Sequence, residues 1–243
     1  MDKINDGYIE NAVELLNDIY KKYSNRYQFE NTAYSKKAYS KNKTDVTDQF
    51  LTTFLRMSRY SVPKLYTGRD FKGEDHTEYF FDDNVLTAQK VFANGSICDS
   101  FYIRTDDQKI RLSFSFNSLL NIHCCSFSGE KIFRIDNAHF DNYGELQYIS
   151  GEQYEYSSGR LVRCTGYDRY APQFPMFKEY VHDEMTVTVN PTLYEYSFIY
   201  DNDGKLAQYA LSYSDKLFNV SPKAAKYFEK VNMNTDIEQI VLW

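Results

Sequence analysis

The spacing of apolar residues changes along the chain, and the change separates predicted helices from predicted strands. Residues 6–23 place apolar side chains three or four positions apart, as one face of an amphipathic helix does: Ile9, Ala12, Val13, Leu16, Ile19 and Tyr23. A second helix is predicted over about 45–60, and Pro63 ends this helical region. A third is predicted over 222–231, where proline occupies the first turn, and the apolar residues 237–243 are a candidate edge strand.

Between the helical segments, apolar and polar residues alternate with a period of two, which is typical of strands with one buried face. Residues 110–116 show this alternation clearly, and Asn94-Gly95 is a strong hairpin signal. One further strand is predicted at 185–189. Because turn signals recur at short intervals, residues 63–221 are predicted to form an antiparallel meander of roughly nine to eleven strands.

A short phrase occurs three times within the meander: an aromatic residue, one to three turn-forming residues, glycine, a charged residue and leucine. The copies lie at 140–146, 156–161 and 200–206. Asn, Asp, Ser and Gly tolerate the positive φ of a tight turn, so each copy predicts a hairpin. The phrase therefore predicts architecture and says little about chemistry.

These elements predict an α+β protein that is mostly β, with one domain over residues 1–243. A helical N-terminal segment (1–62) precedes the meander (63–221), which forms a large antiparallel sheet or an open barrel, and residues 222–243 follow it. The terminal helices are expected to cover sheet edges. The polar stretch 31–44 contains four lysines and is expected to be a solvated loop rather than a phosphate- or membrane-binding arm.

The three copies of the phrase resemble YD repeats, the tyrosine–aspartate hairpins of RHS-type proteins. The best matches lie at 154–161 and 199–206. In that family the hairpins stack into long shells that can enclose toxin domains. With three copies at irregular spacing, the resemblance implies hairpin geometry here and not a shell.

The composition indicates the cellular compartment of the protein and limits the classes of partner it can bind. The formal net charge is −6, and the chain contains 23 tyrosines and four cysteines. The acidity disfavours duplex nucleic acid as a partner, and no apolar run is long enough to cross a membrane. Without a signal-peptide pattern or C-x-x-C spacing, a cytoplasmic protein with buried thiols is expected. The tyrosines predict a sheet face of packed rings, with a stacking or sugar-binding surface as the alternative.

Motifs for catalysis, metal binding and phosphate binding are missing from the sequence. The loop at 201–204 lacks the first ligand and the bidentate acid of a calcium-binding EF-hand. His123 and Cys124 are neighbours in a predicted strand and should point to opposite faces. A carboxylate-dependent hydrolase stays open as an alternative, because the spacing of its acid pair is spatial rather than sequential. No metal or other cofactor is expected.

Acidic residues gather at the predicted turns. Aspartate is both a turn former and a solubilising residue, so structural roles explain such clusters. The functional interpretation is an acidic surface, flanked by aromatic residues, that steers a basic protein partner into place. The candidate partner-binding residues are Asp82, Asp83, Asp106, Asp107, Tyr154, Tyr156, Tyr200, Asp201 and Asp203.

Small acidic chains with aromatic-rich antiparallel sheets resemble immunity proteins of bacterial polymorphic toxin systems. This resemblance implies a non-enzymatic protein that occludes a cognate toxin domain carrying a basic surface. The alternative functions are a ligand- or glycan-binding β module, in which tyrosines line a groove, and the hydrolase named above.

Overall fold

The computed structural model of the chain describes residues 6–41, 66–67, 75–83, 85–129, 131–170, 192–212 and 214–220. Four predicted elements lie outside these ranges: the helices at 45–60 and 222–231, the strand at 185–189 and the candidate edge strand at 237–243. The rest of the predicted architecture falls within them.

The first predicted helix is confirmed. Helix α1 spans Asp6–Tyr23 and buries Ile9, Ala12, Leu16 and Ile19, which form one stripe along it. A short 3-10 helix, η1, follows at Arg26–Phe29. The side chain of Asn25 caps η1 by accepting a hydrogen bond of 3.1 Å from the backbone N–H of Tyr27.

The described strands form one twelve-stranded antiparallel sheet, and their order in the sheet follows their order in the sequence. The strands are β1 (Lys36–Ser40), β2 (His76–Asp82), β3 (Val85–Ala93), β4 (Ser96–Arg104), β5 (Gln108–Ser115), β6 (Ser118–Ser128), β7 (Lys131–Phe140), β8 (Leu146–Ser157), β9 (Arg160–Tyr170), β10 (Thr192–Tyr200), β11 (Leu206–Leu211) and β12 (Ser214–Asn219). The predicted meander is therefore confirmed, and the sheet is open, with β1 and β12 at its two edges.

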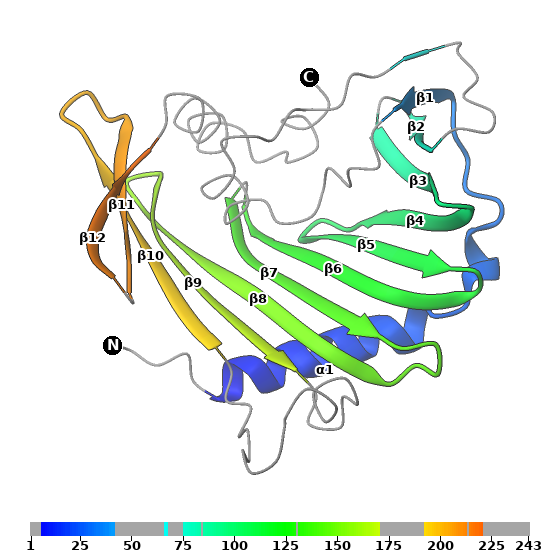
Figure 1. Cartoon of the computed structure of the whole chain (residues 1–243), viewed down its shortest axis with the longest axis horizontal. Coiled ribbons are helices and arrows are strands. Elements are labelled where there is room, and N and C mark those ends of the chain that lie inside the picture. The colour runs from blue at the N-terminus through cyan, green and yellow to red at the C-terminus, as the bar shows by residue number, and fades with distance from the viewer. Residues whose placement is uncertain are drawn as a thin grey trace.

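The sheet is strongly curled. In Figure 1 the strands at its two edges rise on the same side, and α1 runs beneath the strands in the middle. We call the side that α1 covers the helix face and the opposite side the inner face. Because successive side chains in a strand alternate between faces, neighbouring residues such as Cys124 and Cys125 belong to different cores.

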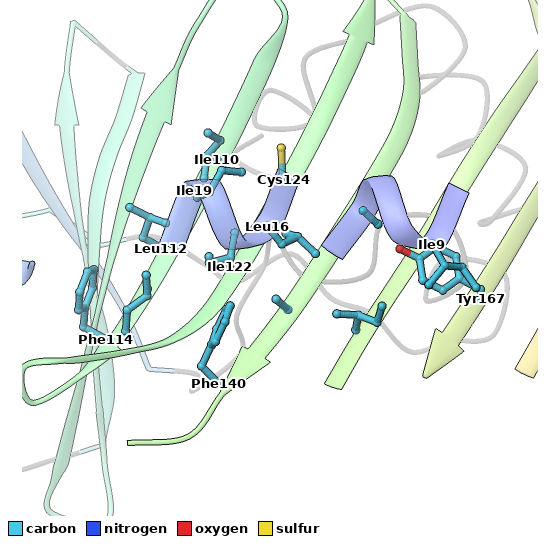
Figure 2. Close-up of a cluster of buried hydrophobic side chains, with 14 residues drawn as sticks. Ile9, Leu16, Ile19, Ile110, Leu112, Phe114, Ile122, Cys124, Phe140 and Tyr167 are labelled. Atoms are coloured by element: carbon cyan, nitrogen blue, oxygen red, sulfur yellow. The ribbon is translucent and has the colours of Figure 1, made fainter. Parts of the chain in front are cut away.

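The core of the helix face lies between α1 and strands β5 to β9 (Figure 2). Leu16 and Ile19 of α1 pack over this part of the sheet, whose buried residues include Ile110, Leu112, Phe114, Ile122, Cys124, Phe140 and Tyr167. Beyond the end of α1, the ring of Phe29 in η1 stacks on Phe101 with centroids 4.8 Å apart. Helix α1 therefore covers a face of the sheet, whereas the sequence had suggested that it covers an edge.

Two apolar clusters lie on the inner face. The larger one joins β6 to β11 and contains Cys125, Ile132, Ile135, Tyr154, Leu161, Cys164, Tyr196, Phe198 and Leu206. The smaller one joins β1 to β3 and contains Ala38, Tyr79, Phe81 and Leu86. Both faces of the sheet thus carry buried apolar residues, whereas the alternation in the sequence had suggested one buried face.

Strand β1 corrects two expectations, because it lies inside the lysine-rich stretch predicted as a loop and inside the segment 1–62 predicted as helical. It pairs in register with β2, from Lys36 opposite Phe81 to Ser40 opposite Thr77. The Lys37 ammonium lies 2.9 Å from Glu78 Oε1 and 5.1 Å from the centre of the Phe80 ring. Pairing with β2 therefore compensates for the low intrinsic strand preference of lysine.

The three copies of the repeated phrase form hairpin turns, as predicted. Gly144, Gly159 and Gly204 all have positive φ, between 78° and 87°. Beside each turn the register shifts by one residue, between 139 and 140, 155 and 156, and 199 and 200. The phrase is therefore a bulged hairpin, in which the extra residue increases the local twist of the strands.

Candidate functional site

Three predicted acidic turns lie at the same end of the strands, along one of the two sides of the sheet where hairpin turns connect them. In a meander every second turn falls at the same end of the strands, and the turns β2–β3, β4–β5 and β10–β11 are all of one parity. These turns hold the six predicted aspartates, which we call the acidic edge: Asp82, Asp83, Asp106, Asp107, Asp201 and Asp203. All six are exposed to solvent.

Two of the six aspartates have structural roles within their turns. Asp107 Oδ1 accepts a hydrogen bond of 2.9 Å from the hydroxyl group of Thr105. Asp201 Oδ1 accepts one of 2.8 Å from the backbone N–H of Lys205. Among the described residues, no hydrogen bond or ion pair engages the carboxylates of the remaining four, Asp82, Asp83, Asp106 and Asp203.

The acidic edge is not continuous. Two cations lie between the acidic β4–β5 and β10–β11 turns: Lys131 follows the β6–β7 turn, and Arg160 follows the β8–β9 turn. The Arg160 guanidinium lies 5.5 Å from the centre of the Tyr200 ring, so this cation packs against the sheet. The turns β2–β3 and β4–β5 therefore form one acidic group, and the turn β10–β11 forms a second.

The predicted tyrosines do not join the acidic edge as exposed anchors. Tyr154 is 4% exposed and its hydroxyl group donates to Glu152 on the inner face. Tyr156 and Tyr200 are half-buried against the same apolar cluster, and the Tyr200 hydroxyl donates to the Leu161 carbonyl at 2.7 Å. The rings thus support the sheet, and Tyr154, which was predicted to bind a partner at the surface, is buried.

A cysteine, a histidine and an asparagine meet on the inner face. Cys125 Sγ lies 3.3 Å from His123 Nε2, and His123 Nδ1 hydrogen-bonds to Asn137 Oδ1. Because an amide oxygen only accepts, Nδ1 carries the proton and Nε2 accepts from the thiol. His123 was expected to point away from its neighbour Cys124, and it instead shares a face with Cys125, two residues along the strand.

This arrangement resembles the order of groups in cysteine nucleophile sites, but its electrostatics oppose that chemistry. Burial raises the pKa of the Cys125 thiol strongly, and the cations Lys109 and Arg111, opposite it and His123 in β5, offset only part of the rise. A nucleophilic cysteine needs an accessible thiolate. Cys125 is buried and protonated, so the three side chains form a hydrogen-bonded contact in the core.

The turns at the other end of the strands carry a group of exposed aromatic residues that was not predicted from the sequence. Three aromatic side chains lie there in solvent, and we call them the aromatic edge: Tyr27 (61% exposed), Phe116 (84%) and Tyr143 (93%). Phe116 was predicted to end a strand, but it lies in the turn between β5 and β6. The sequence offered no local signal for this turn, because Phe116 continues the alternation of residues 110–116.

Comparison with known proteins assigns no family to this chain. Neither a family model nor a curated protein sequence matches this chain. In the part of the chain that the structure describes, no three His, Cys, Asp or Glu side chains converge to hold a metal ion. None of the described helices has the length and apolar character needed to cross a bilayer. The resemblances to YD repeats and to immunity proteins stay predictions.

Proposed function

We propose that this chain is a non-enzymatic, cytosolic binding protein of the immunity type, which neutralises a cognate toxin domain by covering a basic surface on it with the acidic edge. The observation that supports this proposal is the placement of three acidic turns, distant in sequence, along one edge of a single sheet. The tyrosines Tyr154, Tyr156 and Tyr200 support that sheet from within.

The edge suits such a task for two physical reasons. Tight hairpin turns hold their side chains on a stiff scaffold, so little conformational entropy is lost when a partner binds. The carboxylates of Asp82, Asp83, Asp106 and Asp203 have no described partner to give up, and exposed charges of one sign accelerate encounter with a basic surface.

The proposal of a non-enzymatic role rests on the inner face. Its most nucleophile-like group, Cys125, is held protonated by burial, which raises the pKa of its thiol. The protein therefore acts by occupying a surface of its target rather than by turning over a substrate.

The test takes the product of the neighbouring upstream gene as the candidate toxin, and it uses a variant in which Asp82, Asp83, Asp106 and Asp203 are all replaced by asparagine. Asparagine keeps side-chain size and turn preference while it removes charge. The association rate constant at low ionic strength should fall about tenfold, and its dependence on salt should weaken.

The control replaces Glu10 and Glu14, two exposed carboxylates of helix α1 that belong to neither edge, with glutamine. This control should associate at the wild-type rate. Equal rates for the wild type and the fourfold variant, or an equal loss in the control, would show that the acidic edge is not the docking surface. Failure of the neighbouring gene product to bind at all would end the immunity proposal.

A further inference from the structure

We propose that the aromatic edge, formed by Tyr27, Phe116 and Tyr143, is a second docking surface, which anchors a protein partner whose apolar pocket is bordered by basic groups. It lies at the opposite ends of the strands from the acidic edge, so this inference stands or falls independently of the proposed function. In Figure 1 the β5–β6 and β7–β8 turns lie together at the right of the sheet.

The backbone conformation of Phe116 is the clearest indication that the aromatic edge has a role other than folding. Its φ is +53°, in the left-handed region where the Cβ atom of an ordinary residue meets the backbone unfavourably. Three other hairpin turns place Asp83, Asn94 or Ser158 in this conformation, which are small polar residues suited to it, and the turns at 129, 144 and 204 use glycine. A phenylalanine in this conformation is strained, and its ring, which is 84% exposed, buries little apolar surface in return.

The three rings are close enough to act together. The turns that hold Phe116 and Tyr143 are two strands apart, which corresponds to about 10 Å. Tyr27 adjoins Phe116, because the Asn117 amide donates a hydrogen bond of 3.5 Å to the Tyr27 hydroxyl. Aromatic side chains grouped at this scale, with polar residues between them, are typical of the anchors that dominate protein interfaces.

The loop that holds Tyr143 is rigid. Asp141 Oδ1 accepts hydrogen bonds from the backbone N–H groups of Tyr143 (2.8 Å) and Glu145 (2.9 Å). Gly144 has φ +87°, and a Cβ atom there would lie 2.5 Å from the Tyr20 hydroxyl oxygen, so the turn sits tightly on α1. The Tyr143 ring is 93% exposed although its backbone is well held, which suits a preorganised anchor.

The charges around the rings indicate the kind of partner. Three of the described turns of this edge, at 94–95, 116–117 and 141–145, contain the carboxylates of Asp141 and Glu145 and no lysine or arginine. Nearby, Arg26 is held by Asp99 at 2.6 Å, and Lys21 pairs with Asp18 at 3.3 Å. A partner with basic groups around its pocket complements this surface.

The same charges disfavour two other occupants. A second copy of the chain would bring the two sets of carboxylates against each other, which opposes association. Lysine and arginine strengthen the binding of exposed aromatic residues to an anionic membrane, and the three turns named contain neither. A heterologous protein partner is therefore the occupant to which we commit.

The experiment places a photo-crosslinking phenylalanine analogue at position 116 or 143 of the full chain in its native cells. The matched control carries the analogue at position 217, where Leu217 is 55% exposed on the edge strand β12. The protein captured is then purified, and its affinity is measured for the wild type and for Phe116→Asn, Tyr143→Ser and Leu217→Ser. Asparagine accepts the left-handed conformation, so Phe116→Asn removes the ring without disturbing the turn.

We expect positions 116 and 143 to capture one and the same protein, and position 217 not to capture it. Its affinity should fall about tenfold or more in Phe116→Asn and in Tyr143→Ser and stay unchanged in Leu217→Ser. The proposal is overturned if those two variants bind like the wild type, or if no protein is captured. It is equally overturned if the adduct is a second copy of this chain, or if the rings bind phosphatidylcholine–phosphatidylserine vesicles instead. The fourfold acidic-edge variant should keep the adduct, which separates this result from the test of the proposed function.

Discussion

The hydroxyl group of Tyr167 in β9 donates a hydrogen bond of 3.2 Å to Asp136 Oδ1 in β7, across the intervening strand β8. The contact is possible because β8 places Gly151 between them, opposite both residues. Arg134 also donates to Asp136, and its guanidinium lies 4.2 Å from the centre of the Tyr8 ring in α1. This buried polar cluster fixes the N-terminal part of α1 on the sheet.

Gly151→Ala should destabilise the protein by about 1–3 kcal/mol, because overpacking a close-packed core displaces its neighbours. The new Cβ atom would lie 2.6 Å from Tyr167 Cε1 and 2.8 Å from Asp136 Oδ1. Chemical denaturation measures the loss. Ser157→Ala, at an exposed position of the same strand, is the control and should change stability by less than about 0.5 kcal/mol. Equal stability of the two variants would show that β8 can shift to accommodate a methyl group.

Asp136 should make stability depend on pH in a direction opposite to that of most carboxyl groups. Burial raises its pKa above the ordinary 3.8, and hydrogen bonds from Arg134 and Tyr167 offset part of the rise. The folded state therefore holds this proton to higher pH than the unfolded chain does. The contribution of Asp136 to stability is complete below about pH 3.8 and is lost as the pH rises through the folded-state pKa.

The comparison that isolates this effect is Asp136→Asn, which cannot titrate. Across that pH window the stability of Asp136→Asn relative to the wild type should rise with pH and then level off. Denaturant unfolding at a series of pH values gives the difference. A relative stability that falls with rising pH would mean that the pairing with Arg134 outweighs the cost of burial.

Phe116→Asn should stabilise the folded chain by about 0.5–1 kcal/mol, although it removes a large apolar side chain. The substitution relieves a left-handed conformation that phenylalanine adopts at a cost, and the exposed ring contributes little burial in return. Tyr143→Asn, at an equally exposed position outside that backbone region, should give no such gain. Thermal unfolding of both variants measures the contrast, and a destabilised Phe116→Asn would mean that the ring packs usefully in the fold.

The four thiols should differ in reactivity in an order set by burial. Burial raises the pKa of Cys124 to about 12 and raises those of Cys125 and Cys164 as well, so these groups are neither exposed nor ionised. Cys98 is half-buried. Titration of the native protein with a chromogenic disulfide reagent should modify one thiol per chain quickly and all four only after unfolding. Rapid modification of Cys125 in the native state would instead support an accessible nucleophile next to His123.

Local signals in the sequence were sufficient for most of the architecture. Helix α1 was predictable at Asp6–Tyr23 because its stripe repeats with the helical period, and the turn at Asn94 and Gly95 because these residues accept positive φ. Strand β1 was not predictable, because lysine-rich segments rarely form strands alone. It exists through its pairing with β2.

The candidate sites were predictable only in part. The aspartates were correctly placed at exposed turns, since the same residue type that favours a turn also favours solvent. Tyr154 was expected at a surface and is buried, because β8 lies in the middle of the sheet and has apolar neighbours on its inner face. The contact between His123 and Asn137 needs the register of β6 against β7, which no local pattern specifies.

By itself, then, the sequence determined the hairpins, the helix and the exposure of the acidic turns, because these depend on the backbone preferences of a few adjacent residues. Only the tertiary structure decided which turns share an edge, which tyrosines are buried and where the exposed rings gather. Those outcomes depend on strand order, register and curl, which arise from contacts between residues far apart in the chain. The two docking surfaces proposed for this protein therefore become visible only once the sheet is assembled.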